Sequence, residues 1–206
     1  VNISSVNGQT GQFGQTNSLP VAAGPDGSVF LGDPANARLN QYEADGDFVR
    51  GWGWGVATEA DAFEVCTAAS GCRRGQPAYN DDPSTHSGQF MKSGILSQGN
   101  YPSFIAVDAD GVLYANNMDK RLGVPEGPPR IERFDTTASA PGDLVLEPIR
   151  SAEPPNGTPG PVTEINALEV DQGNGNLYAR GYTTIDEIDP TGAGTFVDTH
   201  LAGSPD

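Results

Sequence analysis

The sequence predicts an all-β protein built from a repeated unit of four short strands. A strand–turn–strand pattern occurs at three places, around residues 26–27, 110–111 and 173–175. The composition contains 27 Gly and 17 Pro in 206 residues, which favours many turns over long helices. No convincing amphipathic helical pattern is present, and residues 61–65 are expected to form at most one helical turn. Four short antiparallel strands separated by turns are the content of one β-propeller blade.

The clearest unit covers residues 102–149. Its expected strands are 105–108, 112–115, 130–135 and 144–146. Gly111 lies between the first two strands, where it supplies the positive φ that a tight hairpin turn needs. Ile131 and Phe134 are the apolar contacts of the third strand.

The same unit recurs over residues 20–56 and 162–201. Upstream, residues 21–31 carry strand, turn and strand, and further strands are expected at 38–42 and 47–50. Downstream, the corresponding segments are 168–179, 184–189 and 194–197. Gly11-Gln12-Phe13 before Pro20 is echoed by Gly88-Gln89-Phe90 before Pro102, which supports a repeat.

The chain is expected to be one partial propeller over residues 1–206, with an insertion at 57–101 and a Pro- and Gly-rich linker at 150–161. Propellers need about four to eight blades to close, and three blades leave two sheet faces uncovered. We therefore expect part of a larger, six-bladed propeller, or completion by association between copies. Strands contributed by the polar insertions are a further alternative. The chain begins at Val1, which suggests a mature form or a fragment.

Three units in order resemble the NHL-repeat family of β-propellers. The matching residues are Gly88-Gln89-Phe90, Pro102, Val107-Asp108, Asp110-Gly111, Leu113-Tyr114-Ala115 and the segment 130–135. The segment 51–56, followed by Cys66 and Cys72, is similar to a bacterial NHL subgroup with a cysteine-bearing insertion between blades. The resemblance covers about residues 11–197. It departs from the family pattern after Asn117, where the link to Arg130 is lengthened, and at Thr183-Thr184 in place of an arginine.

Trp52 and Trp54 are the most distinctive candidates for ligand binding. Alternate residues of a strand point to the same face, so the two rings could form a stacking platform for a sugar. The glycines between them leave the opposite face bare for a close backbone approach. Packing between blades or against the insertion is the favoured alternative, because buried aromatic side chains dominate core energetics.

Cys66 and Cys72 are the two cysteines of the chain. A zinc site needs four ligands, and only His86 and His200 could assist, without ligand spacing. A disulfide that staples the insertion is therefore favoured, and it indicates an oxidising, extracytoplasmic compartment.

Asp108 and Asp110 are weak candidates for a metal site, with calcium as the possible ion, because they flank a D-x-D-G turn. The full twelve-residue calcium-loop pattern is absent, and turn chemistry already accounts for the Asp-Gly pair, so no cofactor is predicted. His86 and His200 do not supply the ligand set of metal-dependent propeller lyases. No catalytic residue is identified.

The formal net charge is -16, from 11 Lys plus Arg against 27 Asp plus Glu, and such a surface repels nucleic acid. No stretch approaches the ~18 apolar residues of a transmembrane span. We therefore expect a non-catalytic extracellular or cell-surface module for protein interaction, self-association or glycan binding. The alternative is a metal-assisted propeller lyase or hydrolase.

Overall fold

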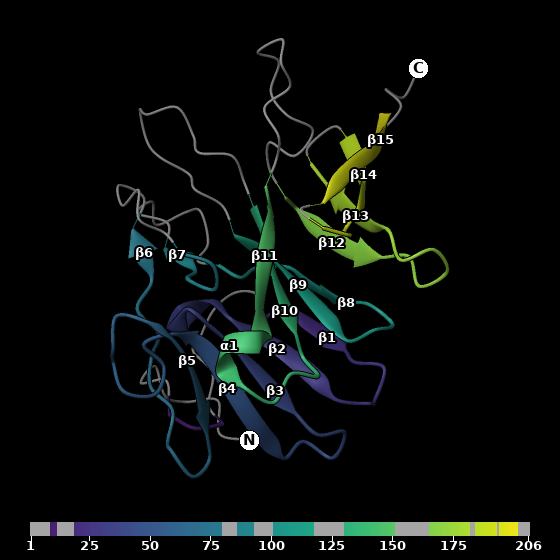
Figure 1. Ribbon diagram of the computed structural model, residues 1–206. Helices are drawn as coiled ribbons and strands as arrows, with labels where there is room; N and C mark the ends of the chain where they lie inside the picture. Colours follow the sequence, from purple (N-terminus) through teal and green to yellow (C-terminus); the bar gives the residue numbers. More distant parts are fainter. Residues whose placement is uncertain are drawn as a thin grey trace.

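The repeated units form three antiparallel sheets in the computed structural model (Figure 1). The structure describes residues 9–11, 19–79, 86–92, 101–117, 130–150, 165–181, 184–192 and 194–201. The first sheet has the order β1-β2-β3-β4-β5, with strands Val21–Ala23, Val29–Asp33, Arg38–Tyr42, Phe48–Trp54 and Phe63–Thr67. The described part of the chain is therefore all-β, as the sequence predicts.

The second and third sheets have four strands each. The second contains β8 to β11 in chain order, with strands Ile105–Val107, Val112–Asn117, Arg130–Asp135 and Val145–Arg150. The third contains β12 to β15, with strands Ala167–Val170, Leu177–Arg180, Thr184–Asp189 and Thr195–Leu201. A separate parallel pair joins β6, Ala78–Tyr79, to β7, Met91–Lys92.

Two local expectations are wrong. Residues 61–65 do not form a helical turn, because Phe63–Thr67 is strand β5 and pairs with β4, with Val65 opposite Trp52. Leu144 does not begin the fourth strand of its unit. It ends the one-turn helix α1, Pro141–Leu144, because Pro141 suits the first position of a helix, and β11 follows at Val145.

The second sheet is buried on both faces. Alternate side chains of a strand point to opposite faces, so this sheet contributes to two apolar layers. Toward the first sheet, Val107, Leu113 and Phe134 pack with Phe30, Leu39 and Trp52. Toward the third sheet, Ala106, Tyr114 and Ile131 pack with Leu168, Leu177 and Ile188. The three sheets are therefore stacked face to face, with the second in the middle.

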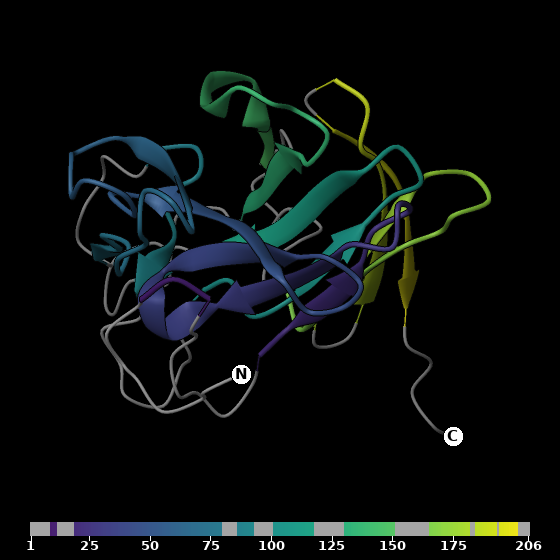
Figure 2. The same ribbon diagram turned by 90° about the horizontal axis from the view of Figure 1, so that it is seen from below.

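The first strands of the three sheets lie side by side. β8 contacts β1 on one side and β12 on the other. The view from below shows the first and second sheets stacked along their lengths, with the third beyond them (Figure 2). In an antiparallel sheet, the turns after the first and third strands lie at the same end. The β1–β2, β8–β9 and β12–β13 turns all project to the right in Figure 1.

A buried arginine links the first sheet to the segments around it. Arg38 at the start of β3 is fully buried, and its Nε lies 3.2 Å from Oδ2 of Asp33, which is also fully buried. The same carboxylate oxygen accepts a hydrogen bond from Asn36 Nδ2 at 2.8 Å. The guanidinium donates to the backbone oxygens of Arg73 at 2.9 Å and Gln9 at 3.2 Å.

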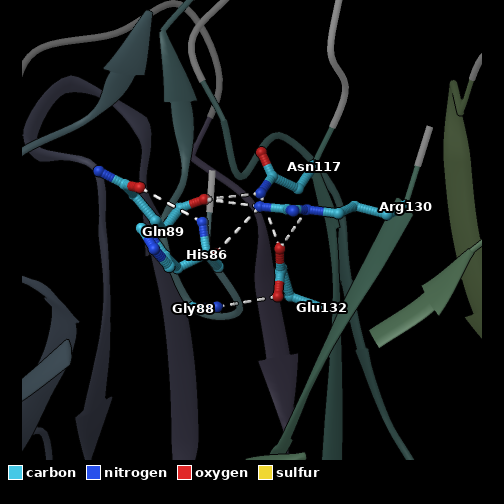
Figure 3. A network of polar contacts seen from close by, with 6 residues as sticks. All are labelled: His86, Gly88, Gln89, Asn117, Arg130 and Glu132. Atoms are coloured by element: carbon cyan, nitrogen blue, oxygen red, sulfur yellow. Dashed lines mark hydrogen bonds and ion pairs between the residues drawn. The ribbon is translucent and has the colours of Figure 1, made fainter. Parts of the chain in front are cut away.

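The second sheet repeats this arrangement at the start of β10 (Figure 3). Arg130 Nε lies 2.6 Å from Glu132 Oε1, and Arg130 Nη2 donates to the backbone oxygen of His86 at 3.1 Å. Further hydrogen bonds join the same network, from Asn117 Nδ2 to Glu132 Oε1, from Asn117 Nδ2 to the Gln89 oxygen and from the Gly88 N–H to Glu132 Oε2.

Arg38 and Arg130 donate to equivalent residues just before the two Gly-Gln-Phe motifs. Gln9 and His86 each lie two residues before the glycine of a Gly-Gln-Phe motif, at Gly11 and Gly88. The echo therefore corresponds to a shared contact, although Gln12 and Phe13 lie outside the described residues.

Candidate binding cleft between the second and third sheets

One end of the three sheets is built from turns with the same internal hydrogen bond. In each turn that follows a first or third strand, an aspartate Oδ1 accepts the backbone N–H two residues later. The donor–acceptor pairs are Ser28 to Asp26, Asp47 to Asp45, Asp110 to Asp108, Thr137 to Asp135, Gly173 to Asp171 and Thr191 to Asp189. An aspartate in this position stabilises the turn and leaves a carboxylate at the surface. These six turns, with the side chains of Asp47 and Asp110, are called the acidic turn face below.

Arginines reach from one sheet to the turns of the next. Arg50 on β4 donates to the backbone oxygens of Thr136 at 2.6 Å and Ala138 at 2.8 Å, in the turn after β10. Arg133 on β10 donates to the backbone oxygens of Pro190 and Gly192, in the turn after β14. Arg50 therefore holds the turn after β10 against the first sheet, and Arg133 holds the turn after β14 against the second sheet.

A cleft of about 490 Å³ opens beside Arg133, between the second and third sheets. It is lined by turn and strand residues of both sheets. The polar lining consists of Asp108, Asp110, Tyr114, Arg133, Gln172, Asn174, Asn176, Asp189 and Thr191. Val112, Leu146 and Pro190 are among its apolar lining. A concave site of this size, with convergent polar groups, is typical of a small-ligand or side-chain binding site.

The lining side chains are positioned by hydrogen bonds to both sheets. Tyr114 is 3 % exposed, and its hydroxyl donates to Asp108 Oδ2 at 2.8 Å. Asp108 Oδ1 also accepts the Val112 N–H at 2.8 Å, so both carboxylate oxygens are engaged. Gln172 Nε2 donates to the Val107 backbone oxygen at 2.9 Å, which joins the β12–β13 turn to β8. The walls of the cleft are therefore fixed from two sides.

The electrostatics of the cleft follow from burial and these hydrogen bonds. Burial, and next the hydrogen bond to Asp108, raise the pKa of Tyr114 above its ordinary value, so the phenol stays neutral and acts as a donor. The Thr191 backbone N–H, followed by its hydroxyl, lowers the pKa of Asp189, so this carboxylate stays charged. The lining carries three carboxylates against one guanidinium, which makes the cleft net negative at neutral pH.

The tryptophans expected as a stacking platform are buried. Trp52 is 0 % exposed, packs against Phe30 and Phe134, and has the Arg50 guanidinium 5.6 Å from its ring centre. Trp54 is 9 % exposed and stacks on His86 with the ring centres 4.8 Å apart. Neither ring presents a free face, so the structure favours the packing alternative.

The face of β4 opposite Trp52 and Trp54 is closely packed, as the glycines indicate. A Cβ on Gly51 would lie 2.8 Å from Asn40 Oδ1, and one on Gly53 would lie 2.9 Å from the Ala37 backbone oxygen. The glycines of this segment therefore permit the close approach that the sequence indicates.

The disulfide prediction is confirmed. Cys66 on β5 is bonded to Cys72, with the two Cα atoms 5.2 Å apart. Both cysteines are buried against Val56 and Phe48. The bond closes a loop beside the first sheet, far along the chain from the cleft residues.

The calcium candidates lie in the cleft but do not form a metal site with their neighbours. Asp108 uses both carboxylate oxygens in the turn and on Tyr114. Within the residues that the structure describes, no three His, Cys, Asp or Glu side chains are gathered closely enough to hold an ion. The histidines are also apart from this site, since His86 stacks on Trp54 and His200 lies 3.5 Å from Glu187.

Sequence reasoning did not single out Arg133, Gln172 or Asp189. A signal for the turns was present, because Asp precedes Ser, Thr, Asp or Gly by two residues at all six positions. The contacts of Arg133 with residues 190 and 192 depend on how separate sheets pack, and no local pattern specifies that.

No known protein family matches the chain, and a search of the curated proteins finds no similar sequence. The resemblance to NHL repeats therefore stays a prediction. In the parts of the chain for which the structure gives positions, helices are too short to cross a membrane.

Proposed function

We propose that the chain is a non-catalytic binding module outside the cytoplasm that recognises a basic surface of another protein through its acidic turn face. The scaffold in this proposal is an NHL-type β-propeller, six-bladed when complete or completed by association between copies. The observation that carries the proposal is the gathering of six aspartate-stabilised turns, from three sheets, at one end of the stack.

The propeller assignment is supported by how the sheets are stacked. Each sheet has its first strand beside the first strand of its neighbour, as blades have around a common axis. The second sheet is covered on both faces by apolar packing, which is the environment of an internal blade. The disulfide supports an extracytoplasmic location, because such bonds persist in oxidising compartments.

The choice of a basic protein partner is supported by charge. Arg50 and Arg133 reach this end of the sheets, and their terminal nitrogens donate to backbone oxygens. Arg50 offsets part of the charge of Asp135, and the remaining turn aspartates leave this end net negative. An acidic surface of this kind steers a basic partner into contact, and the attraction weakens with salt.

Selection of peptides tests the proposal although the partner is not identified. A random peptide library displayed on phage is selected on the immobilised full chain, and enriched peptides are then measured by fluorescence anisotropy. We expect enrichment in Lys and Arg, and an affinity that falls at least tenfold between 50 and 500 mM salt, on the order expected for several screened charges.

A matched pair of triple variants locates the binding surface. Asp45→Asn, Asp47→Asn and Asp110→Asn together remove three charges from the acidic turn face. Glu59→Gln, Glu169→Gln and Asp198→Asn remove three charges from exposed residues elsewhere. We expect only the first triple to weaken peptide binding by tenfold or more. Equal loss in both triples, or no enrichment of basic peptides, would overturn the proposal.

Metal content separates this function from the alternative enzyme. A metal-assisted lyase or hydrolase retains tightly bound metal after dialysis, whereas a binding module need not. Stoichiometric metal in the dialysed protein, measured by mass spectrometry of the elements, would favour the enzyme over the proposal.

A further inference from the structure

We propose that the cleft between the second and third sheets binds the ammonium or guanidinium group of a basic side chain from the protein partner. This inference rests on the proposed function and assigns the cleft as the anchor within the acidic turn face. It is argued from which hydrogen-bonding groups of the lining are used and which are free.

The strong donors of the lining are largely engaged within the protein. Arg133 donates Nε to the Glu147 backbone oxygen, and its two terminal nitrogens to the oxygens of Pro190 and Gly192. The Tyr114 hydroxyl donates to Asp108, and Gln172 Nε2 donates to the backbone of β8. The lining therefore offers few donors to a guest, and a guest that brings its own donors suits it better.

The acceptors of the lining are in excess. Asp110 lies in the cleft with its side chain exposed, and its backbone N–H rather than its carboxylate forms the turn hydrogen bond. Asp189 accepts hydrogen bonds from the N–H and hydroxyl of Thr191, and a carboxylate has about four lone-pair sites, so acceptor capacity remains for a guest. Ammonium and guanidinium groups carry donors and no acceptors, so they complement this set.

The apolar part of the lining suits the remainder of such a side chain. Val112, Leu146 and Pro190 line the same cleft as the carboxylates. Lys and Arg bury their methylene stems along apolar surface while the charged group reaches polar partners. A volume of about 490 Å³ accommodates one such side chain with water.

Two other guests fit less well. A sugar ring is commonly held on an exposed aromatic face, but Tyr114, the aromatic residue of the lining, is 3 % exposed. A calcium ion needs six to eight oxygen ligands, and both oxygens of Asp108 already accept hydrogen bonds. Both guests are included as outcomes of the test.

The experiment is a titration of the ¹⁵N-labelled full chain followed by NMR. The probes are the peptide acetyl-Gly-Lys-Gly-amide, its Arg counterpart, the same lysine peptide with an acetylated Nε, free spermidine, calcium chloride and a neutral disaccharide. We expect the two cationic peptides to shift the amides of residues 108–114, 172–176 and 189–192. We expect the acetylated peptide to bind at least tenfold more weakly, because it lacks the charge.

Two single variants provide the matched control. Asp110 and Asp198 are both exposed aspartates, but Asp110 lines the cleft, whereas Asp198 lies on β15 outside the acidic turn face. We expect Asp110→Asn to weaken the lysine peptide at least fivefold and Asp198→Asn to leave its affinity unchanged.

Several results would overturn the inference. They are equal binding of the acetylated peptide, equal loss in Asp198→Asn, saturation of the cleft amides by calcium or the disaccharide with no response to the cationic peptides, and a response to spermidine alone. If the cleft amides do not respond while phage-selected basic peptides still bind the acidic turn face, the cleft inference fails and the proposed function stands. If basic peptides bind nowhere, both fail.

Discussion

Arg38 and Asp33 form an ion pair with no exposed side-chain surface, whereas Arg73 and Glu59 form one whose side chains are 56 % and 61 % exposed. Removing one partner of a buried pair leaves the other charge desolvated, at a cost of about 3–5 kcal/mol. Exposed pairs contribute roughly 0–1 kcal/mol. We expect Arg38→Met to lower the free energy of unfolding in urea by about 3 kcal/mol or more, and Arg73→Met by less than about 1 kcal/mol. Similar losses would mean that the Arg38 network adds no more than a surface contact.

Two buried tyrosines should respond oppositely to loss of the hydroxyl. Among the described residues, the buried Tyr42 hydroxyl has no hydrogen-bond partner, so Tyr42→Phe is expected to stabilise the fold by about 1 kcal/mol. The Tyr114 hydroxyl donates to Asp108, so Tyr114→Phe is expected to cost about 1 kcal/mol. Denaturant titration of both variants at neutral pH measures the difference.

The raised pKa of Tyr42 predicts that the free energy of unfolding depends on pH in the alkaline range. Burial raises its pKa to about 12, above the ~10 of an unfolded tyrosine. The folded state therefore holds the proton more tightly, and this stabilisation is present below about pH 10 and is lost as pH rises through about 12. We expect the unfolding free energy to fall less steeply over this range in Tyr42→Phe. Parallel curves for variant and parent would contradict the assignment.

At the scale of the elements, Arg133 is expected to hold the third sheet onto the second. Lys cannot reproduce its three donations, so Arg133→Lys should cost about 2 kcal/mol and loosen β12–β15. We expect faster amide hydrogen exchange over residues 167–201 and no change in the first sheet. Arg180→Lys, on an exposed residue of the third sheet, is the control. Uniformly faster exchange over all three sheets would show a global effect instead.

The disulfide joins β5 of the first sheet to the loop that follows it. The loop from Cys66 to Cys72 is short, and loop-closure entropy for such a length corresponds to about 2 kcal/mol. We expect dithiothreitol to lower the stability of the parent by that amount and to leave the double variant Cys66→Ala, Cys72→Ala unaffected. A reductant effect on the double variant would show that the reagent acts elsewhere.

The first two strands of each sheet were predictable because they pair across a short turn marked by Asp and Gly. Strand β5 was not, because a unit of four strands was already complete before Phe63, and the acidic, Ala-rich residues 57–62 do not mark a turn. The cleft could not be predicted, because Arg133 meets its acceptors across two sheets. The burial of Trp52 agrees with the packing alternative favoured from the sequence. The alternation of Gly and Trp in residues 51–55 fits an exposed face equally well.

At the scale of the whole molecule, the propeller proposal requires a closed ring of sheets. The natural protein should therefore have a denatured mass well above 21.5 kDa, or a native mass that is a multiple of the chain mass. Mass spectrometry under denaturing and native conditions measures both. A stable monomer of 21.5 kDa in both states would contradict a closed propeller, and would leave the stack of sheets as an open array.

The two ends of the stack differ in how their strands are joined. At the acidic turn face, each turn has a fixed length set by its aspartate, and one extra residue beside Asp108 would invert the side-chain alternation of β9. At the opposite end, β2 and β3 are joined through Pro34–Asn36, whereas β9 and β10 are joined through residues 118–129, and both pairs keep their register. We therefore expect a peptide inserted between Asn117 and Arg130 to leave the pairing of β9 with β10 and the geometry of the acidic turn face unchanged.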